Sequence, residues 1–252
     1  ALPIWFVKYF TGDVELSALE LDDLNAMYDG ELAYQDMRMG ELMDMFKRKG
    51  VLDRALVIVL GDHGENLGEH RMTDHQLSVY DTVLRIPMLL RFPPLLPRGE
   101  KVQSTVQLNS LFPTVAEILG VAPEKLPASF STPSLLPVIA REDPGLDVAF
   151  SEYKSPEEIL RILRYKVPDF DVSALDRDLL SARTRLLKYI LTSNGSDELY
   201  SLETDPGEEE NLCREDNCSA NNPLRKVIDR WMEDTPEYQP GQGGSAISDQ
   251  QD

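Results

Sequence analysis

A run of aliphatic residues that ends in a polar, glycine-rich loop constrains the fold more than any other part of the chain. Residues 55–60 (Ala-Leu-Val-Ile-Val-Leu) are long enough for one buried parallel strand, and Gly61, Asp62 and His63 follow at once. Open α/β sheets bind ligands at the carboxyl ends of their strands, where glycines let the backbone turn sharply. The segment therefore predicts a sheet with a functional site at its edge.

The histidines of the chain all belong to this segment. They are His63, His70 and His75, and the sequence contains no others. Structural histidines that are scattered through a fold rarely cluster so tightly, so the loop is predicted to carry chemistry. A zinc site made of these three residues alone is one interpretation, weakly supported by their spacing on a loop.

Composition limits the class of protein. The chain has 252 residues, 42% of them hydrophobic, and a formal net charge of -19. This predicts a soluble globular protein with a real core, and it argues against nucleic acid or an anionic membrane as a partner. No apolar stretch reaches the roughly 20 residues that span a bilayer. Residues 1–10 lack the basic start and cleavage site of a signal peptide, so the localisation stays unknown.

Residues 1–145 are predicted to form part of an α/β domain. The expected elements are a strand over 3–10, a long helix over 24–49 capped by Asp22 or Asp23, the strand over 55–60, a second buried strand over 85–92 and a helix over 108–119. The Met and aromatic stripe of the long helix is predicted to face the core. Strand, loop and strand together indicate a mixed or parallel sheet with flanking helices.

A second unit is predicted over residues 146–235, a small α+β subdomain with antiparallel strands. A strand over 148–153, a helix that begins at 155–158, a hairpin of strands over 182–191 and 198–202, and a helix over 222–233 are expected. Cys213 and Cys218 form a disulfide in an oxidising compartment, or are two ordinary loop cysteines. Residues 236–252, rich in Gly, Gln, Ser and Asp, are predicted to be a disordered tail.

Several of these stretches resemble the carboxyl-terminal half of sulfatases, members of the alkaline-phosphatase-like superfamily. The resemblance extends over residues 3–232 and rests on ordered motifs, each of them weak alone. They are residues 24–36, the Asp-His-Gly after the central strand, Tyr-Asp-Thr at 80–82, Arg-Ile-Pro at 85–87, Phe-Pro-Thr with Ile-Leu-Gly at 112–120, and Lys-Tyr-Ile at 188–190 with Glu-Leu-Tyr-Ser-Leu-Glu-Thr-Asp-Pro-Gly-Glu at 198–208.

The resemblance implies hydrolysis of a sulfate ester of a small molecule or glycan, with a formylglycine nucleophile and a divalent cation. Asp62 and His63 match the family's cation-binding pair, and carboxylate oxygen with neutral imidazole suits calcium first, or magnesium or manganese. His75 lies near a position where many members place a Lys on the sulfate, which makes it the catalytic candidate. His70 has a weaker claim, as a residue that supports the ligands.

The departures from the family pattern are equally informative. The chain contains no nucleophile signature, Cys or Ser followed by x-Pro-Ser-Arg, and it lacks the acids that hold the other side of the cation. Residues 131–135 (Ser-Thr-Pro-Ser-Leu) imitate the signature without its Arg and follow the histidine loop. We therefore expect a partial chain with one wall of the site, no nucleophile, and an exposed sheet edge through which it self-associates.

Two further classes of function remain open. A phosphoryl or phosphonate ester hydrolase of the same superfamily would use the same Asp62 and His63, and the nucleophile segment would be needed to tell it from a sulfatase. A non-catalytic remnant or interaction module is favoured by the missing nucleophile.

Overall fold

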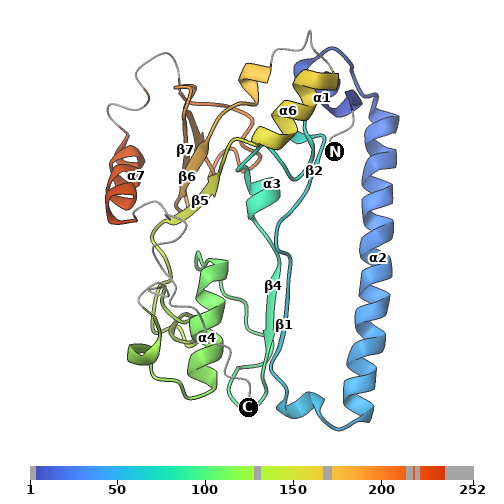
Figure 1. Cartoon of the computed structure of the whole chain (residues 1–252). Coiled ribbons are helices and arrows are strands. Elements are labelled where there is room, and N and C mark those ends of the chain that lie inside the picture. The colour runs from blue at the N-terminus through green and yellow to red at the C-terminus, as the bar shows by residue number, and fades with distance from the viewer. Residues whose placement is uncertain (1–3, 128–131, 167–171, 214–217, 219–221, 236–252) are drawn as a thin grey trace, which may run out of the picture.

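Helices and three antiparallel sheets make up the described part of the chain (Figure 1). The computed structural model describes residues 4–127, 132–166, 172–213, 218 and 222–235. The helices are α1 (Ile4–Thr11), α2 (Ala18–Arg48), α3 (Asp81–Leu84), α4 (Leu111–Ile118), α5 (Leu136–Ile139), α6 (Glu157–Lys166) and α7 (Pro223–Asp234). The strands are β1 (Val57–Leu60), β2 (Asn66–Leu67), β3 (Thr73–Asp74), β4 (Met88–Arg91), β5 (Ala149–Tyr153), β6 (Leu179–Arg183), β7 (Leu187–Thr192) and β8 (Glu198–Ser201).

The central strand β1 pairs with β4, but the pairing is antiparallel, so the expected parallel strand is wrong. Val57 lies opposite Arg91 and Leu60 opposite Met88, and the β1 residues are half-buried. A parallel neighbour requires a crossover that carries the chain back along the strand. Here the chain returns at the end of β1, where the Gly61 amide donates to the carbonyl oxygen of Pro87 at 3.2 Å. Strand β4 therefore runs in the opposite direction to β1.

The first segment is a helix, which contradicts the strand predicted over residues 3–10. A helix satisfies the backbone groups of α1 within the segment, whereas a strand would need a neighbouring edge. The hydroxyl of Tyr9, a buried residue of α1, donates to the carbonyl oxygen of Gly68 at 3.2 Å. The Arg71 side chain donates to the Tyr9 carbonyl oxygen at 3.0 Å. Helix α1 therefore packs on the segment that follows β2.

Helix α2 begins earlier than predicted and is not part of the core. Its N-cap is Ser17, which forms a capping box with Glu20, so Asp22 and Asp23 lie inside the helix. No α2 residue is buried, and Met27 keeps 72% of its surface exposed. The predicted core stripe is thus wrong, because α2 stands beside the β1–β4 ribbon with its apolar side chains uncovered (Figure 1).

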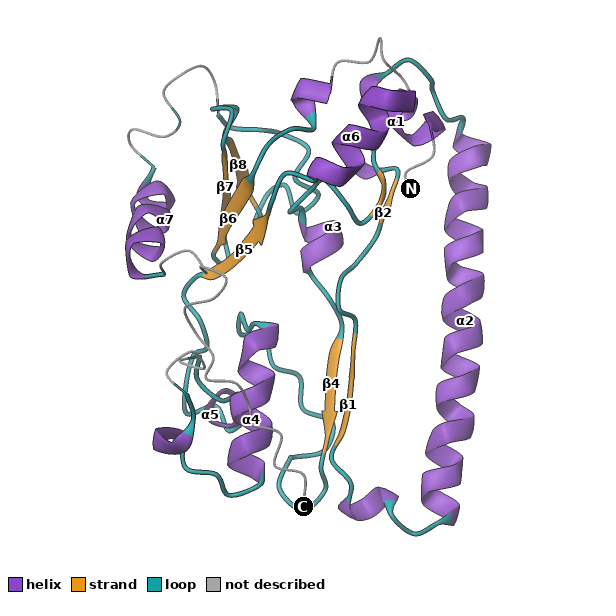
Figure 2. Cartoon of the chain, viewed as in Figure 1, coloured by secondary structure: helices purple, strands orange, loops and turns teal. Residues whose placement is uncertain are grey.

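The four-stranded sheet β5-β6-β7-β8 contributes to two hydrophobic clusters of the described residues, one on each of its faces, and α7 lies beside it (Figure 2). Leu180, Ala182 and Tyr189 pack against Leu224 and Ile228 of α7 on one face. The alternate residues of β6 and β7, Leu179 and Ile190, pack on the other face in a cluster with Met72, Val79, Tyr80 and Tyr200. The segment after the histidine loop therefore rests on the C-terminal sheet.

Most elements of the second unit agree with the sequence. The strand β5, the helices α6 and α7 and the β7–β8 hairpin lie where they are expected, as does α4 in the first unit. The single strand expected over 182–191 is instead two strands, because Thr184 stabilises a turn in which its hydroxyl accepts from the amides of Leu186 and Leu187. Cys213 and Cys218 are bonded to each other. The predicted tail lies outside the described residues, and the division at residue 145 stays a prediction.

Candidate functional site

The loop after β1 begins with a cation-binding candidate that is open to solvent. The Asp62 side chain is 88% exposed, and its Oδ1 lies 3.9 Å from Nε2 of His63. Nδ1 of His63 lies 2.8 Å from the carbonyl oxygen of Gly64. Since a carbonyl oxygen can only accept, Nδ1 carries the proton and Nε2 of the neutral ring keeps its lone pair. Such an arrangement is common for histidines that bind metals.

The ring of His75 stacks on the ring of His63. Their centroids are 3.9 Å apart at an interplanar angle of 23°. Nδ1 of His75 lies 3.1 Å from a carboxylate oxygen of Glu65 and 3.0 Å from Oδ1 of Asp74. The structure thus joins His63 and His75, which are twelve positions apart in the sequence.

Glu65 completes a group that could hold a metal ion. One ligand atom each from His63, Glu65 and His75 lies within 4.8 Å of the others. Sequence reasoning did not single out Glu65, although a carboxylate two residues after His63 in the same loop was a usable signal. Asp62 is adjacent to this group without belonging to it. The roles predicted for Asp62, His63 and His75 stay predictions.

His70 lies in a different environment. Its ring stacks on Tyr80 with centroids 3.6 Å apart, and its Nε2 is buried with no hydrogen-bond partner among the described residues. Burial lowers the pKa of His70 and outweighs the opposing effect of the Glu198 charge. The group within 4.8 Å does not include His70, so the described residues give the three-histidine zinc interpretation no support.

The loop that carries these histidines is fastened to α3. The Gly64 amide donates to the Val83 carbonyl oxygen at 2.7 Å. A Cβ atom at Gly64 would lie 2.0 Å from the Thr82 carbonyl oxygen, so only glycine allows this approach. Two residues later, Asn66 accepts a hydrogen bond from the Thr82 hydroxyl at 2.6 Å.

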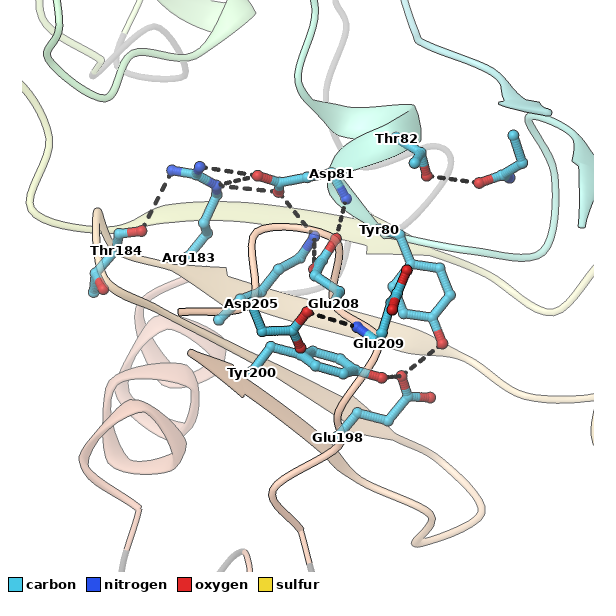
Figure 3. A network of polar contacts seen from close by, with 12 residues as sticks. Tyr80, Asp81, Thr82, Arg183, Thr184, Glu198, Tyr200, Asp205, Glu208 and Glu209 are labelled. Atoms are coloured by element: carbon cyan, nitrogen blue, oxygen red, sulfur yellow. Dashed lines mark hydrogen bonds and ion pairs between the residues drawn. The ribbon is translucent and has the colours of Figure 1, made fainter. Parts of the chain in front are cut away.

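A buried charged network in turn fastens α3 to the C-terminal sheet (Figure 3). Asp81 accepts from Arg183 and from Lys188, whose Nζ is 3.0 Å from Oδ1. Glu208 forms an ion pair with Lys188 at 2.7 Å and accepts from the Asp81 amide at 2.6 Å. Burial opposes the charge of Asp81, but Arg183 and Lys188 prevail and hold the pKa of Asp81 below its usual value. Burial raises the pKa of Glu208.

Beside this network, one carboxylate orients two tyrosines. Glu198 accepts from the hydroxyls of Tyr80 and Tyr200 at 2.7 and 2.8 Å (Figure 3). Arg177 lies 3.3 Å from the other carboxylate oxygen. Burial raises the pKa of both tyrosines, and both therefore act as hydrogen-bond donors. Tyr80, on which His70 stacks, is held in place from the C-terminal sheet.

None of the described helices has the length and apolar character needed to cross a membrane.

Two family models match the chain. The model described as Sulfatase matches residues 10–121. The model described as N-sulphoglucosamine sulphohydrolase, C-terminal, matches residues 68–234, which is more than half of the chain.

Curated proteins and solved structures are also similar to this chain. Arylsulfatase K of Bos taurus is 28% identical over 231 residues, which cover 88% of this chain and 39% of the relative. The structure of BT4656 in complex with its substrate D-glucosamine-2-N,6-O-disulfate matches 90% of this chain and 44% of its own, with a TM-score of 0.66 and 22% identity. The phosphonate monoester hydrolase of Agrobacterium radiobacter matches 86% of this chain and 42% of its own, with a TM-score of 0.68 and 24% identity.

These likenesses confirm the α/β fold class, although the described strands pair antiparallel. The chain spans about two fifths of the length of the curated relative. The family expected from the motifs after β1 is confirmed by the models that match those residues. The chain belongs to the sulfatase family.

Proposed function

We propose that this chain supplies one wall of the active site of a sulfatase, a hydrolase of sulfate esters that uses a divalent cation. The observation that carries the proposal is the meeting of His63 and Glu65, shortly after β1, with His75, which follows β3, in a chain of the sulfatase family. A sulfated small molecule or glycan is the substrate class we propose. The structure of BT4656 with a glucosamine disulfate supports this choice by analogy.

The donor atoms of the loop fit a divalent cation. Asp62 offers an exposed carboxylate, and Nε2 of His63 keeps its lone pair because Nδ1 donates to a carbonyl. Carboxylate oxygen and one neutral imidazole suit calcium, our first choice, and also magnesium or manganese. When bound, the cation would polarise a sulfate oxygen.

His75 is the proposed catalytic residue. Glu65 and Asp74 both lie within hydrogen-bond reach of its Nδ1, so they orient the ring and leave Nε2 for the substrate. From there, His75 would donate to a sulfuryl oxygen or protonate the leaving alkoxide. The proposed formylglycine nucleophile is made from a Cys or Ser in a signature that this sequence does not contain, and the chain alone is therefore expected to show no turnover.

A phosphonate or phosphoryl ester hydrolase is the second candidate. The structural likeness to the Agrobacterium radiobacter phosphonate monoester hydrolase favours it. The identity there is below that to arylsulfatase K, so the sulfatase proposal comes first.

Calorimetry with Ca²⁺, Mg²⁺ and Mn²⁺ tests the cation site in the chain itself. We expect Asp62→Asn and His63→Gln each to weaken binding at least about tenfold, as is usual when metal-site groups are removed. The control is Asp36→Asn, which removes an exposed carboxylate from α2. Binding that is the same in all variants would contradict the proposal.

Adding inorganic sulfate or methylphosphonate separates the two candidates. Histidine ring signals in NMR spectra report the binding, and we expect sulfate to shift the His75 signal at a lower concentration than methylphosphonate does. The reverse order would favour the phosphonate hydrolase.

A further inference from the structure

The two arms that carry the site are joined by a very short ribbon. His63 and Glu65 precede β2, and His75 follows β3. The β2–β3 ribbon has only two residue pairs, Asn66 opposite Asp74 and Leu67 opposite Thr73. So short a pair of strands is marginal by itself and fixes its register weakly. Something else must keep His75 at 3.9 Å from His63.

Asn66 connects the two arms and α3 with one side chain. It is completely buried. Its Nδ2 donates to the Asp74 carbonyl oxygen at 2.7 Å and to the Ser78 hydroxyl at 3.4 Å, and its Oδ1 accepts from the Thr82 hydroxyl at 2.6 Å. Among neutral side chains, an amide offers donors at one end and an acceptor at the other, so no aliphatic or hydroxyl residue reproduces this set.

The backbone just before His75 is strained, which makes this support necessary. Asp74 has φ 100, a conformation that L-residues rarely adopt. Strained residues persist only where their surroundings hold them. Asp74 is held at its carbonyl oxygen by Asn66, and its carboxylate accepts from the His75 amide at 2.7 Å. The strain therefore fixes the direction in which the chain enters His75.

The other end of the connection is rigid. Thr82 belongs to α3, and its neighbour Asp81 is held by Arg183, Lys188 and Glu208 (Figure 3). Because α3 is fixed to the C-terminal sheet through Asp81, the Asn66 side chain, which binds Thr82, is fixed relative to that sheet as well.

From these contacts we infer that Asn66 is a positioning residue, which holds His75 against His63 and Glu65. The consequence for cation and sulfate binding rests on the function proposed above. The placement of the two rings does not depend on that function.

NMR of the chain with labelled histidines tests the placement, because the sequence has just three histidine rings. In the wild type we expect an NOE cross-peak between His63 and His75, and another between His70 and Tyr80, whose centroids are 3.6 Å apart. Asn66→Asp keeps the shape of the side chain but removes both amide hydrogens. We expect the first cross-peak to disappear and the second to remain, as a measure of intact packing.

The control is Asn25→Asp, since Asn25 also donates to a carbonyl oxygen, that of Leu21 at 2.8 Å, but on exposed α2. Both cross-peaks should remain in this variant. Retention of both in Asn66→Asp would overturn the inference.

A second pair of variants covers the case in which Asn66→Asp unfolds the loop. Thr82→Val removes the hydroxyl that donates to Asn66, and Thr82→Ser keeps it. We expect Val to abolish the His63–His75 cross-peak alone and Ser to preserve it. Retention of this cross-peak in Thr82→Val, or loss of both cross-peaks in either Thr82 variant, would overturn the role.

Cation affinity provides an independent readout. We expect Asn66→Asp to weaken Mn²⁺ binding about tenfold, the lower end of the range for groups that support metal ligands. If the wild type binds no cation, the proposed function fails while the NOE result still decides the role of Asn66. If Mn²⁺ binds to Asn66→Asp as tightly as to the wild type and both cross-peaks remain, the positioning role fails and the proposed function stands.

Discussion

Lys188 is completely buried although it carries a charge, and it is surrounded by carboxylates. Its ammonium lies 3.0 Å from Asp81 and 2.7 Å from Glu208, while Asp81 has Arg183 as a second cation. Lys188→Met would leave Glu208 buried without a charged partner. We expect the free energy of unfolding to fall by about 3–5 kcal/mol, as when one partner of a buried pair is removed.

Urea denaturation measures this change. The matched control is Arg161→Met, because Arg161 and Glu158 form an ion pair in which both side chains are about four-fifths exposed. That substitution should cost about 0–1 kcal/mol. Equal effects of the two substitutions would show that the buried network does not hold α3 to the sheet.

The buried ring of His70 makes stability depend on pH. Its pKa is lowered mainly by burial, so the folded chain favours the neutral ring. The stability that this contributes is present above the unfolded pKa of about 6.5 and is lost as the pH falls through the lower folded pKa. Between about pH 7.5 and about pH 5.5, wild-type stability should therefore decrease, and His70→Phe should decrease less because it keeps a ring on Tyr80 without titrating.

Unfolding curves at the two pH values measure the difference. Gln35→Ala, an exposed substitution in α2 that removes no titrating group, is the control. It should keep the full pH dependence. The same slope in His70→Phe and the wild type would contradict the assignment to His70.

Single residues of the site could be predicted where chemistry and neighbouring sequence coincide. Asp62 and His63 follow a strand of aliphatic residues directly, and the pattern marks them. Glu65 and Asn66 were missed because their roles depend on partners in β3 and α3, which become neighbours through folding. Nothing in the sequence around His70 shows that its ring stacks on Tyr80.

Among the elements, α2 depends on its own local interactions. It has no buried residue, and its first turn is fixed by the capping box of Ser17 and Glu20, with the Ser17 amide 2.8 Å from the Glu20 carboxylate. Ser17→Ala should cost about 1 kcal/mol of helix stability. We expect faster hydrogen exchange of the Leu21 amide, which donates to the Ser17 carbonyl oxygen, with little change in β6 and β7.

Gln35→Ala, an exposed substitution in the middle of α2, is the control. It should leave exchange in the first turn unchanged. If Ser17→Ala also leaves it unchanged, the cap does not determine where α2 begins.

The sequence predicts elements best where the signal is local. Asn222 at the N-cap and Pro223 at N1 predict the start of α7, and Gly195 predicts the β7–β8 turn. The strand predicted over residues 3–10 is wrong because an apolar run fits a strand or a helix equally well, and tertiary context decides between them. The predicted direction of the β1 pairing is wrong for a related reason, since an aliphatic run does not reveal whether its neighbour is parallel or antiparallel.

For the whole molecule, α2 and the β1–β4 ribbon present apolar groups and strand edges that no described residue covers. The exposed apolar side chains of α2 are Leu19, Met27, Leu32, Tyr34, Met37, Met39 and Leu42. Such surfaces favour self-association, which the net charge of -19 opposes. Raising the salt from about 0.15 M to about 1 M shortens the Debye length from about 8 Å to about 3 Å. We therefore expect the mass in light scattering to increase with salt.

Met27→Glu combined with Leu32→Glu should reduce this increase, whereas Glu31→Gln, on the same helix, should not. Limited proteolysis should cut the first unit before residues 148–232, whose sheet is covered by α7. A single monomeric species at high salt, or a resistant first unit, would contradict the expectation.

The exposure of α2 also determines which glycines of the chain can be substituted. Gly30 and Gly40 lie inside this helix with no atom within 4 Å of an added Cβ. Alanine at either position should stabilise the helix by about 0.5–1 kcal/mol. At Gly64 the same substitution meets the Thr82 carbonyl oxygen at 2.0 Å. In a library of single codon replacements, alanine should therefore be accepted at Gly30 and Gly40 and rejected at Gly64.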